Sequence, residues 1–303
     1  MEVCRSSHTS SGRQGGNAWL ARASCLALGV LVSCCLPGLA LGKDDDDSDE
    51  ASTKKKSTLP NIYLDLATFY TSVPANTLAI GFRNVTSLPT LSSPASQNVA
   101  FNAPLTVDLN DRVSVYGGIG ASTTRTDIYS WTSLIVDSWN VGFQADVYEQ
   151  KGGAIPTVTV QSTLSRSVGS ILPTTTITSI VELNYALNED ETKGLLAGTR
   201  YVSVSVDSDL AKVNPAIIGY VGGYYQWPSN WKLSGRLGVQ SFGGAQIANL
   251  TPFKPFTQPI VRLDLDQMDD NDNRLFGVTA EISWTPKPAY QLTLRTPLYA
   301  IRN

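Results

Sequence analysis

The side chains with the clearest capacity for chemistry are five aspartates gathered near the C-terminal end of the chain. They are Asp264, Asp266, Asp269, Asp270 and Asp272. Oxygen-rich loops suit Ca²⁺, but the spacing does not match an EF-hand, because Arg274 replaces the required glycine and Ala280 the final carboxylate. We therefore expect a solvated hairpin tip. A weak divalent-cation site that bridges to lipopolysaccharide stays open as the alternative.

The N-terminal 42 residues hold every histidine and cysteine of the chain, namely Cys4, His8, Cys25, Cys34 and Cys35. Three arginines, an apolar run over 25–32 and the small-residue site Ala40-Leu41-Gly42 predict a cleaved secretory signal peptide over residues 1–42. The sequence Leu31-Val-Ser-Cys34 resembles a bacterial lipobox, so a lipid on Cys34 is the alternative to cleavage after Gly42.

The predicted mature chain therefore lacks the side chains that most catalytic and metal sites need. Without histidine or cysteine it cannot form a Ser–His or Cys–His dyad, or hold zinc through imidazole or thiolate. We expect no enzymatic activity, no cofactor and no metal.

Charge gives little reason to expect a nucleic-acid partner. The chain has 23 basic and 26 acidic side chains, and removing three arginines and Glu2 with residues 1–42 leaves 20 and 25, a net charge of −5. Without a basic excess, nucleic-acid binding is not expected. Residues 43–60 carry opposed acidic and basic blocks with hardly an apolar side chain, which predicts a disordered linker.

The residues after the linker alternate between apolar and polar types. In Val99–Leu109 every second side chain is apolar or small, and after Asn110-Asp111 the same pattern continues to Ser122. A period of two places these two sets on opposite faces of an antiparallel hairpin. Each run is about 11 residues, the length that a tilted strand needs to cross a bilayer.

The same alternation recurs to the end of the chain and predicts 12 or 13 strands, with no convincing helix. The expected strands cover 61–70, a doubtful 77–83, 99–110, 112–122, 139–149, 157–165, 177–187, 194–206, 216–226, 231–242, 260–266, 275–284 and 289–299. Aromatic residues at the predicted strand ends, such as Trp227, Trp231 and Trp284, are typical of a membrane interface. We therefore predict an all-β fold: one antiparallel transmembrane β-barrel of about 12 strands (range 10–14) over 61–303. A secreted or lipid-anchored β-sandwich that serves in binding or adhesion is the alternative.

A leader, a cysteine-free mature chain and long hairpins such as Leu105–Tyr116 resemble a Gram-negative outer-membrane β-barrel of the porin-like kind. The resemblance covers roughly Asn61 to Tyr299. It implies a location in the cell outer membrane, contact with outer-membrane lipid and lipopolysaccharide, and a narrow channel or binding site for small solutes.

The polar faces of the predicted strands point eleven charged side chains into the lumen. These pore-lining candidates are Asp65, Asp108, Arg112, Asp146, Glu182, Lys232, Arg236, Arg262, Asp264, Glu281 and Arg295. Basic members dominate the C-terminal strands and acidic members the N-terminal ones, which predicts a transverse field that favours dipolar solutes. The alternative is that these charges pair across the lumen and close it. On the outer face, Val107 and Val204 are expected to contact lipid.

The linker gives the first testable prediction. A chain that begins at Leu59 behind a signal peptide should assemble as well as the full chain, because residues 43–60 cannot bury enough apolar surface to offset their ordering entropy. Heat-modifiable mobility of the membrane-fractionated protein measures assembly. Failure of the truncated chain to reach the membrane would give the linker a structural or targeting role.

Overall fold

The computed structural model describes residues 61–75, 95–150, 152–168, 173–208, 211–247, 254–269, 274–284 and 287–301. All of them belong to one compact unit, Lys56–Asn303. The predicted signal peptide, the linker and the doubtful strand over 77–83 lie outside the described residues. Among the described residues, none forms a helix long and apolar enough to cross a bilayer.

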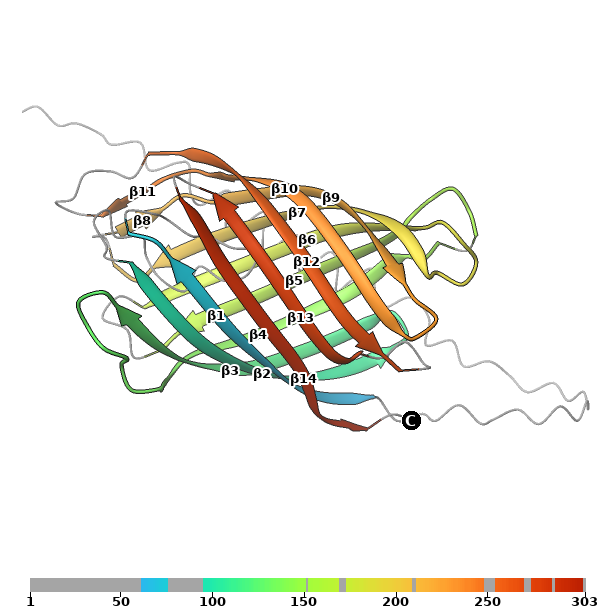
Figure 1. Cartoon of the computed structure of the whole chain (residues 1–303), viewed down its shortest axis with the longest axis horizontal. Coiled ribbons are helices and arrows are strands. Elements are labelled where there is room, and N and C mark those ends of the chain that lie inside the picture. The colour runs from blue at the N-terminus through green and yellow to red at the C-terminus, as the bar shows by residue number, and fades with distance from the viewer. Residues whose placement is uncertain are drawn as a thin grey trace, which may run out of the picture. The chain divides into compact units, whose positions relative to one another are not determined.

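Twelve strands close into a single antiparallel barrel (Figure 1). Their bounds are β1 (Ile62–Val73), β2 (Ser96–Asn110), β3 (Val113–Thr126), β4 (Ile135–Tyr148), β5 (Thr157–Ser167), β6 (Thr174–Ala186), β7 (Lys193–Val206), β9 (Ala216–Gln226), β10 (Trp231–Phe242), β12 (Phe256–Met268), β13 (Arg274–Trp284) and β14 (Pro288–Ile301). Each strand pairs with its neighbours along the chain, and β1 pairs with β14 to close the ring. The predicted fold class is confirmed, and the two-sheet sandwich is excluded.

The β2–β3 hairpin shows how the sequence sets the register. Along each strand, successive side chains point to opposite faces of the sheet. On the outer face, Val107 lies opposite Val115. At the turn, the Asn110 side-chain oxygen accepts hydrogen bonds from the backbone N–H groups of Arg112 and Val113, both at 2.8 Å. This local bond is the reason that Asn favours such turns. It fixes where the chain reverses.

The two ends of the barrel differ in their connections. We call the end where β1 begins and β14 ends the terminal end; there the chain reverses over 111–112, 149–156, 187–192, 227–230 and 269–273. The strands that flank the longest connections, 74–95 and 243–255, end and begin at the opposite end, which we call the far end. Short turns on the side of both termini and longer loops on the other side are typical of outer-membrane barrels, whose termini are periplasmic.

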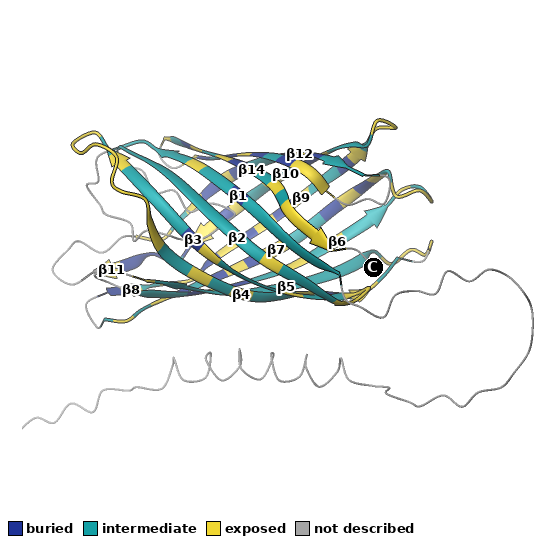
Figure 2. Ribbon diagram, turned by 90° about the horizontal axis from the view of Figure 1, so that it is seen from below, coloured by how far each residue is buried: buried dark blue, intermediate teal, exposed yellow. Residues whose placement is uncertain are grey.

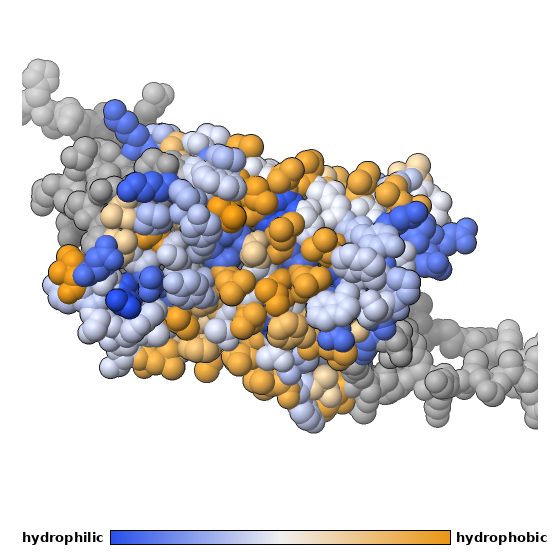
Figure 3. All heavy atoms as spheres, viewed as in Figure 1, coloured by the Kyte–Doolittle hydropathy of each residue, from blue (hydrophilic) through white to orange (hydrophobic). Residues whose placement is uncertain are grey.

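Apolar side chains cover the outside of the barrel between its two ends. Figure 2 shows buried and exposed residues alternating along several strands, and Figure 3 shows apolar side chains gathered over the middle of one face. Leu237 and Val221, for example, are each 62% exposed. Exposed Trp227 lies at the terminal end, and exposed Trp284 and Tyr290 lie at the far end. An apolar belt between interfacial aromatics fits a bilayer.

The expectation that Val204 contacts lipid is wrong. Val204 is 7% exposed and packs inside the far mouth of the barrel with Val202, Ala216, Phe242 and Ala245. Ala245 belongs to β11 (Ala245–Ile247), which pairs with β8 (Ala211–Val213) in a small second sheet. The physical reason is that Arg200 and Val204 lie on the same face of β7. An arginine that faces lipid at midplane costs about 2–4 kcal/mol, so this face turns inward and Val204 with it.

The outer face generates the second prediction. Replacing outward-facing Val107 with Arg should destabilise the barrel by about 2–4 kcal/mol if the position lies near midplane. The matched control is Thr106→Arg, because Thr106 faces the lumen opposite Tyr116. Urea unfolding in lipid vesicles measures both. Equal tolerance of arginine at the two positions would contradict the assignment of the faces.

Candidate functional site: the charged wall of the lumen

Asp264 of β12 is the centre of an ionic cluster inside the barrel. Its carboxylate accepts a two-bond contact from Arg262 at 2.7 and 2.8 Å, one from Arg236 at 2.8 Å and one from Arg295 at 3.2 Å. The Thr279 hydroxyl donates a further bond at 2.5 Å. The Asp264 side chain is only 4% exposed. A buried carboxylate needs such partners, because desolvation of an uncompensated charge costs several kcal/mol.

Glu182 of β6 joins the same cluster from across the curved wall. Its carboxylate accepts a hydrogen bond from Arg236 at 3.2 Å and one from the Tyr220 hydroxyl at 2.7 Å. The Arg236 guanidinium carbon lies 5.8 Å from the centre of the Tyr220 ring. Gly198 lies opposite Tyr220, and a Cβ there would come within 2.6 Å of the tyrosine ring and hydroxyl. Glycine at 198 therefore makes room for Tyr220.

Further charges extend this wall toward both ends. Glu281 of β13 is 5% exposed and lies opposite Arg262. Toward the terminal end, Asp266 forms an ion pair with Arg274 at 2.9 Å. Lys232 lies opposite Asp266, with its ammonium 4.5 Å from the centre of the Tyr224 ring. We call the inward faces of β6, β7, β9, β10, β12, β13 and β14 the charged wall.

The strands β2 to β5 present a different interior, which we call the polar wall. Its inward side chains include Thr106, Ser114, Tyr116, Asn140, Gln144 and Gln161, and all of them are partly or fully exposed. The Tyr116 hydroxyl lies 2.6 Å from Thr163 and accepts a bond from Gln161 at 2.8 Å. Hydrogen bonds among neutral groups thus organise this wall, which keeps more contact with water than the charged wall.

Ten of the eleven predicted lumen residues fall into three groups. The cluster brings together Glu182, Arg236, Arg262, Asp264 and Arg295, while Lys232 and Glu281 lie on the same wall. Asp108 and Asp146 lie on the polar wall, where Asp146 accepts a bond from Thr159 at 2.6 Å. Asp65 is half-buried in β1 and is attracted by Arg274 and Arg295.

Arg112 lies at the terminal end, outside the barrel interior. It follows the β2–β3 turn and forms an exposed ion pair with Glu149 at 2.9 Å. Arg112 lies outside the interior because it immediately follows the turn, whichever face of the strand its side chain belongs to. Conversely, the sequence reasoning missed Arg200 of β7, which faces inward and is 3% exposed.

The aspartate cluster near the C-terminal end does not form one hairpin tip. Asp264 and Asp266 lie within β12 and point inward, so the expectation of a solvated tip is wrong for these two. Asp270 and Asp272 lie outside the described residues. Within the described ranges, no group of three or more histidine, cysteine or acidic side chains is arranged to hold a metal ion.

An ion pair at the far end joins the end of β5 to the connection that follows β7. Asp207, just past β7, accepts hydrogen bonds from Arg166, one of them at 3.0 Å. Donation from this guanidinium lowers the pKa of Asp207, since the bond favours the ionised carboxylate. Both side chains are substantially exposed, so the pair adds little stability.

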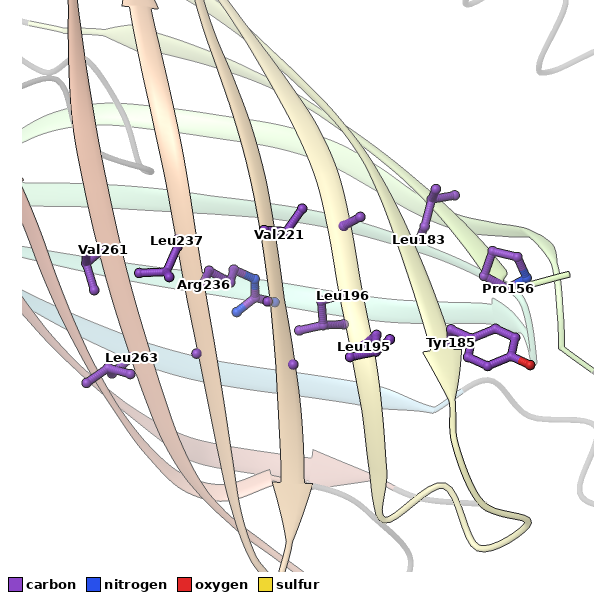
Figure 4. Close-up of a pocket in the computed structure, with 14 residues that line it drawn as sticks. Pro156, Leu183, Tyr185, Leu195, Leu196, Val221, Arg236, Leu237, Val261 and Leu263 are labelled. Atoms are coloured by element: carbon purple, nitrogen blue, oxygen red, sulfur yellow. The ribbon is translucent and has the colours of Figure 1, made fainter. Parts of the chain in front are cut away.

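A groove of about 780 Å³ marks the outer surface of the charged wall (Figure 4). Its sides are apolar residues of β6 to β12, including Leu195, Val221, Leu237 and Leu263. Gly223 and Gly235 form part of its floor, and because they lack side chains, the wall there is one backbone layer thick.

Comparison with known proteins gives a likeness of fold. No protein-family model and no curated protein match the sequence. The barrel is similar to an outer membrane channel from Pseudomonas putida F1, with a TM-score of 0.51, 10% identity, and coverage of 83% of this chain and 100% of that chain. The transport unit of the autotransporter AIDA-I from Escherichia coli scores 0.46 at 11% identity, covering 90% and 96%. The translocator domain of NalP from Neisseria meningitidis scores 0.42 at 11% identity, covering 92% and 97%.

The closed twelve-strand ring, the apolar belt and the polar interior define the class of protein. The chain has the fold of an outer-membrane β-barrel, as its porin-like pattern predicts.

The ionic cluster generates the third prediction. Asp264→Asn leaves three arginines around a neutral amide, and removing one partner of a buried ion pair typically costs about 3–5 kcal/mol. The midpoint of urea unfolding should fall accordingly. The control is Asp146→Asn, an inward carboxylate with a single hydroxyl partner, which should cost about 1 kcal/mol. Similar losses in both variants would contradict the central role of Asp264.

Proposed function

We propose that the protein is a narrow outer-membrane channel for small solutes, with a preference for dipolar or zwitterionic molecules over simple ions. The observation that carries the proposal is the uneven interior, in which a packed charged wall faces a more exposed polar wall. The fold likeness to an outer membrane channel supports the class and says nothing of the solute.

The size of the barrel supports a narrow path. Side chains fill the interior of eight-stranded barrels, whereas barrels of 16 strands hold an aqueous channel. Twelve strands lie between these limits. On the charged wall, inward Gln240, Gln258 and Thr293 are at most 1% exposed, so packed side chains occupy that half of the cross-section. We place the path along the polar wall, because its inward side chains are more exposed.

The distribution of charge supports the preference for dipolar solutes. Asp108 and Asp146 lie on the polar wall, and the arginines around Asp264 lie opposite them. Low-dielectric walls focus such fields, and charges within a narrow lumen set ion preference. A solute with separated positive and negative groups can satisfy both walls, whereas a simple ion is attracted by one and repelled by the other. The pairing of Glu182 and Asp264 with arginines weakens this field without cancelling it.

The proposal also includes contact of the barrel with outer-membrane lipid and the absence of enzymatic activity. The apolar belt contacts membrane lipid, and lipopolysaccharide surrounds the far end. We infer no enzymatic activity, and the support is that the sequence after residue 42 has neither histidine nor cysteine.

Reversal potentials across planar bilayers in a KCl gradient test the channel and its field. Arg236→Gln should shift the reversal potential toward cation preference, and Asp146→Asn should shift it toward anion preference, because each variant weakens one of two opposed walls. Arg112→Gln, which changes charge outside the interior, should leave the potential unchanged. No conductance in the wild type would end the channel proposal. Shifts of the same sign in Arg236→Gln and Asp146→Asn would end the transverse field.

A further inference from the structure

Arg200 is the exception to the pairing rule of the charged wall. Arg236, Arg262 and Arg295 all bind Asp264, but Arg200 has no hydrogen bond or ion pair from its side chain to any described residue, although it is 3% exposed. Its Nε atom is enclosed without an acceptor. Since a buried cation without a partner is costly, an arginine in this state points to a ligand that supplies the missing anion.

A second set of unsatisfied groups lies in the same row of the barrel. Arg200 pairs in register with Ile218, which pairs with Gln240, which pairs with Gln258. The Gln258 amide nitrogen donates to the Gln240 oxygen at 3.1 Å, and the buried Gln240 amide nitrogen and Gln258 oxygen are both left without a hydrogen-bond partner. Two strand spacings of about 4.8 Å separate Arg200 from Gln240, and the fully buried Ile218 lies between them in the same row.

The local balance of charge favours an anion. The charged groups that act on Arg200 are Glu281, which attracts it, and Arg262, which repels it; the Tyr220 hydroxyl is the remaining titratable neighbour. Arg200 and the three arginines of the cluster therefore face three carboxylates, Glu182, Asp264 and Glu281, which leaves one positive charge in surplus. Asp264 cannot neutralise the surplus, because it already serves three arginines.

We propose that Arg200, on the inward face of β7, forms an anion-binding subsite that takes the carboxylate or phosphate group of a small solute. The proposal rests on the channel function above and names the chemical group that its interior selects. A guanidinium matches planar oxyanions with two parallel hydrogen bonds, which a lysine ammonium cannot do.

The test is unfolding of the full chain in lipid vesicles by urea at constant ionic strength, with chloride replaced by inorganic phosphate or by acetate. A ligand that binds only the folded state raises the unfolding midpoint as its concentration increases. The wild type should show this rise. Arg200→Gln should weaken the apparent affinity at least tenfold, and Arg200→Lys should keep part of it. Arg112→Gln is the matched control and should retain the full response.

Each result decides between an anion site and a structural arginine. A response to acetate alone assigns the site to carboxylates, a response to phosphate alone assigns it to phosphates, and a response to both assigns it to oxyanions in general. No response in the wild type overturns the inference, whether or not Arg200→Gln folds. Without added anion, Arg200→Gln should be at least as stable as the wild type; a marked loss of stability would show that Arg200 has a structural partner instead.

Bilayer conductance of the same preparations separates this inference from the proposed function. An anion response without wild-type conductance would end the channel proposal alone. Conductance without an anion response would end the subsite alone.

Discussion

The structure depends on one constraint, which is that a backbone inside hydrocarbon must satisfy its own hydrogen bonds. A row of unpaired N–H and C=O groups on either edge would be exposed to lipid if the sheet stayed open. Pairing of β1 with β14, from Ile62–Ile301 to Ser72–Tyr290, removes both edges. The register of that pairing shifts once, between Leu64 and Asp65, where the bulge lets the two strands meet.

Closure of the barrel also determines which side chains the interior must accommodate. Half of the side chains of every strand point inward, and the ring is too wide for aliphatic residues to fill. One wall packs charged groups around Asp264, whose buried carboxylate is compensated by Arg236, Arg262 and Arg295. The other wall uses neutral groups such as Tyr116 and Gln161, which bond to each other and to water. The division places packing and solvation in separate parts of one lumen.

The sequence predicts the strands and most of their faces, because a period of two survives whatever the neighbouring strands are. The prediction is wrong for Val204, because the hydrophobicity of a side chain does not by itself distinguish the lipid-facing side of a strand from a packed interior. Arg200 carries the stronger signal in that strand, since the cost of a charge in lipid exceeds the gain from an exposed valine. Arg200, Val202 and Val204 share one face of the strand, so an inward Arg200 predicts that both valines point inward as well.

Which charged side chains pair with each other cannot be predicted from the sequences of single strands. Glu182 meets Arg236 because the wall curves between β6 and β10, and no local pattern encodes that curvature. Likewise, the aspartates after Leu263 look alike in sequence, but Asp264 and Asp266 lie within a strand that continues to Met268. Their inward direction follows from the length of the strand, which the acidic composition of the segment obscures.

The closing pair also has a kinetic consequence. Every other pair in the ring joins strands that follow each other along the chain, whereas β1 and β14 come from opposite ends of it. Loop-closure entropy grows with the length of chain between two partners, and distant contacts form slowly. The bonds from Arg236 and Arg295 to Asp264 span only β10 to β14, so they can curve the C-terminal half of the sheet before the ring is complete. We therefore expect assembly from a preformed arc, with the seam between the first and last strands closing last.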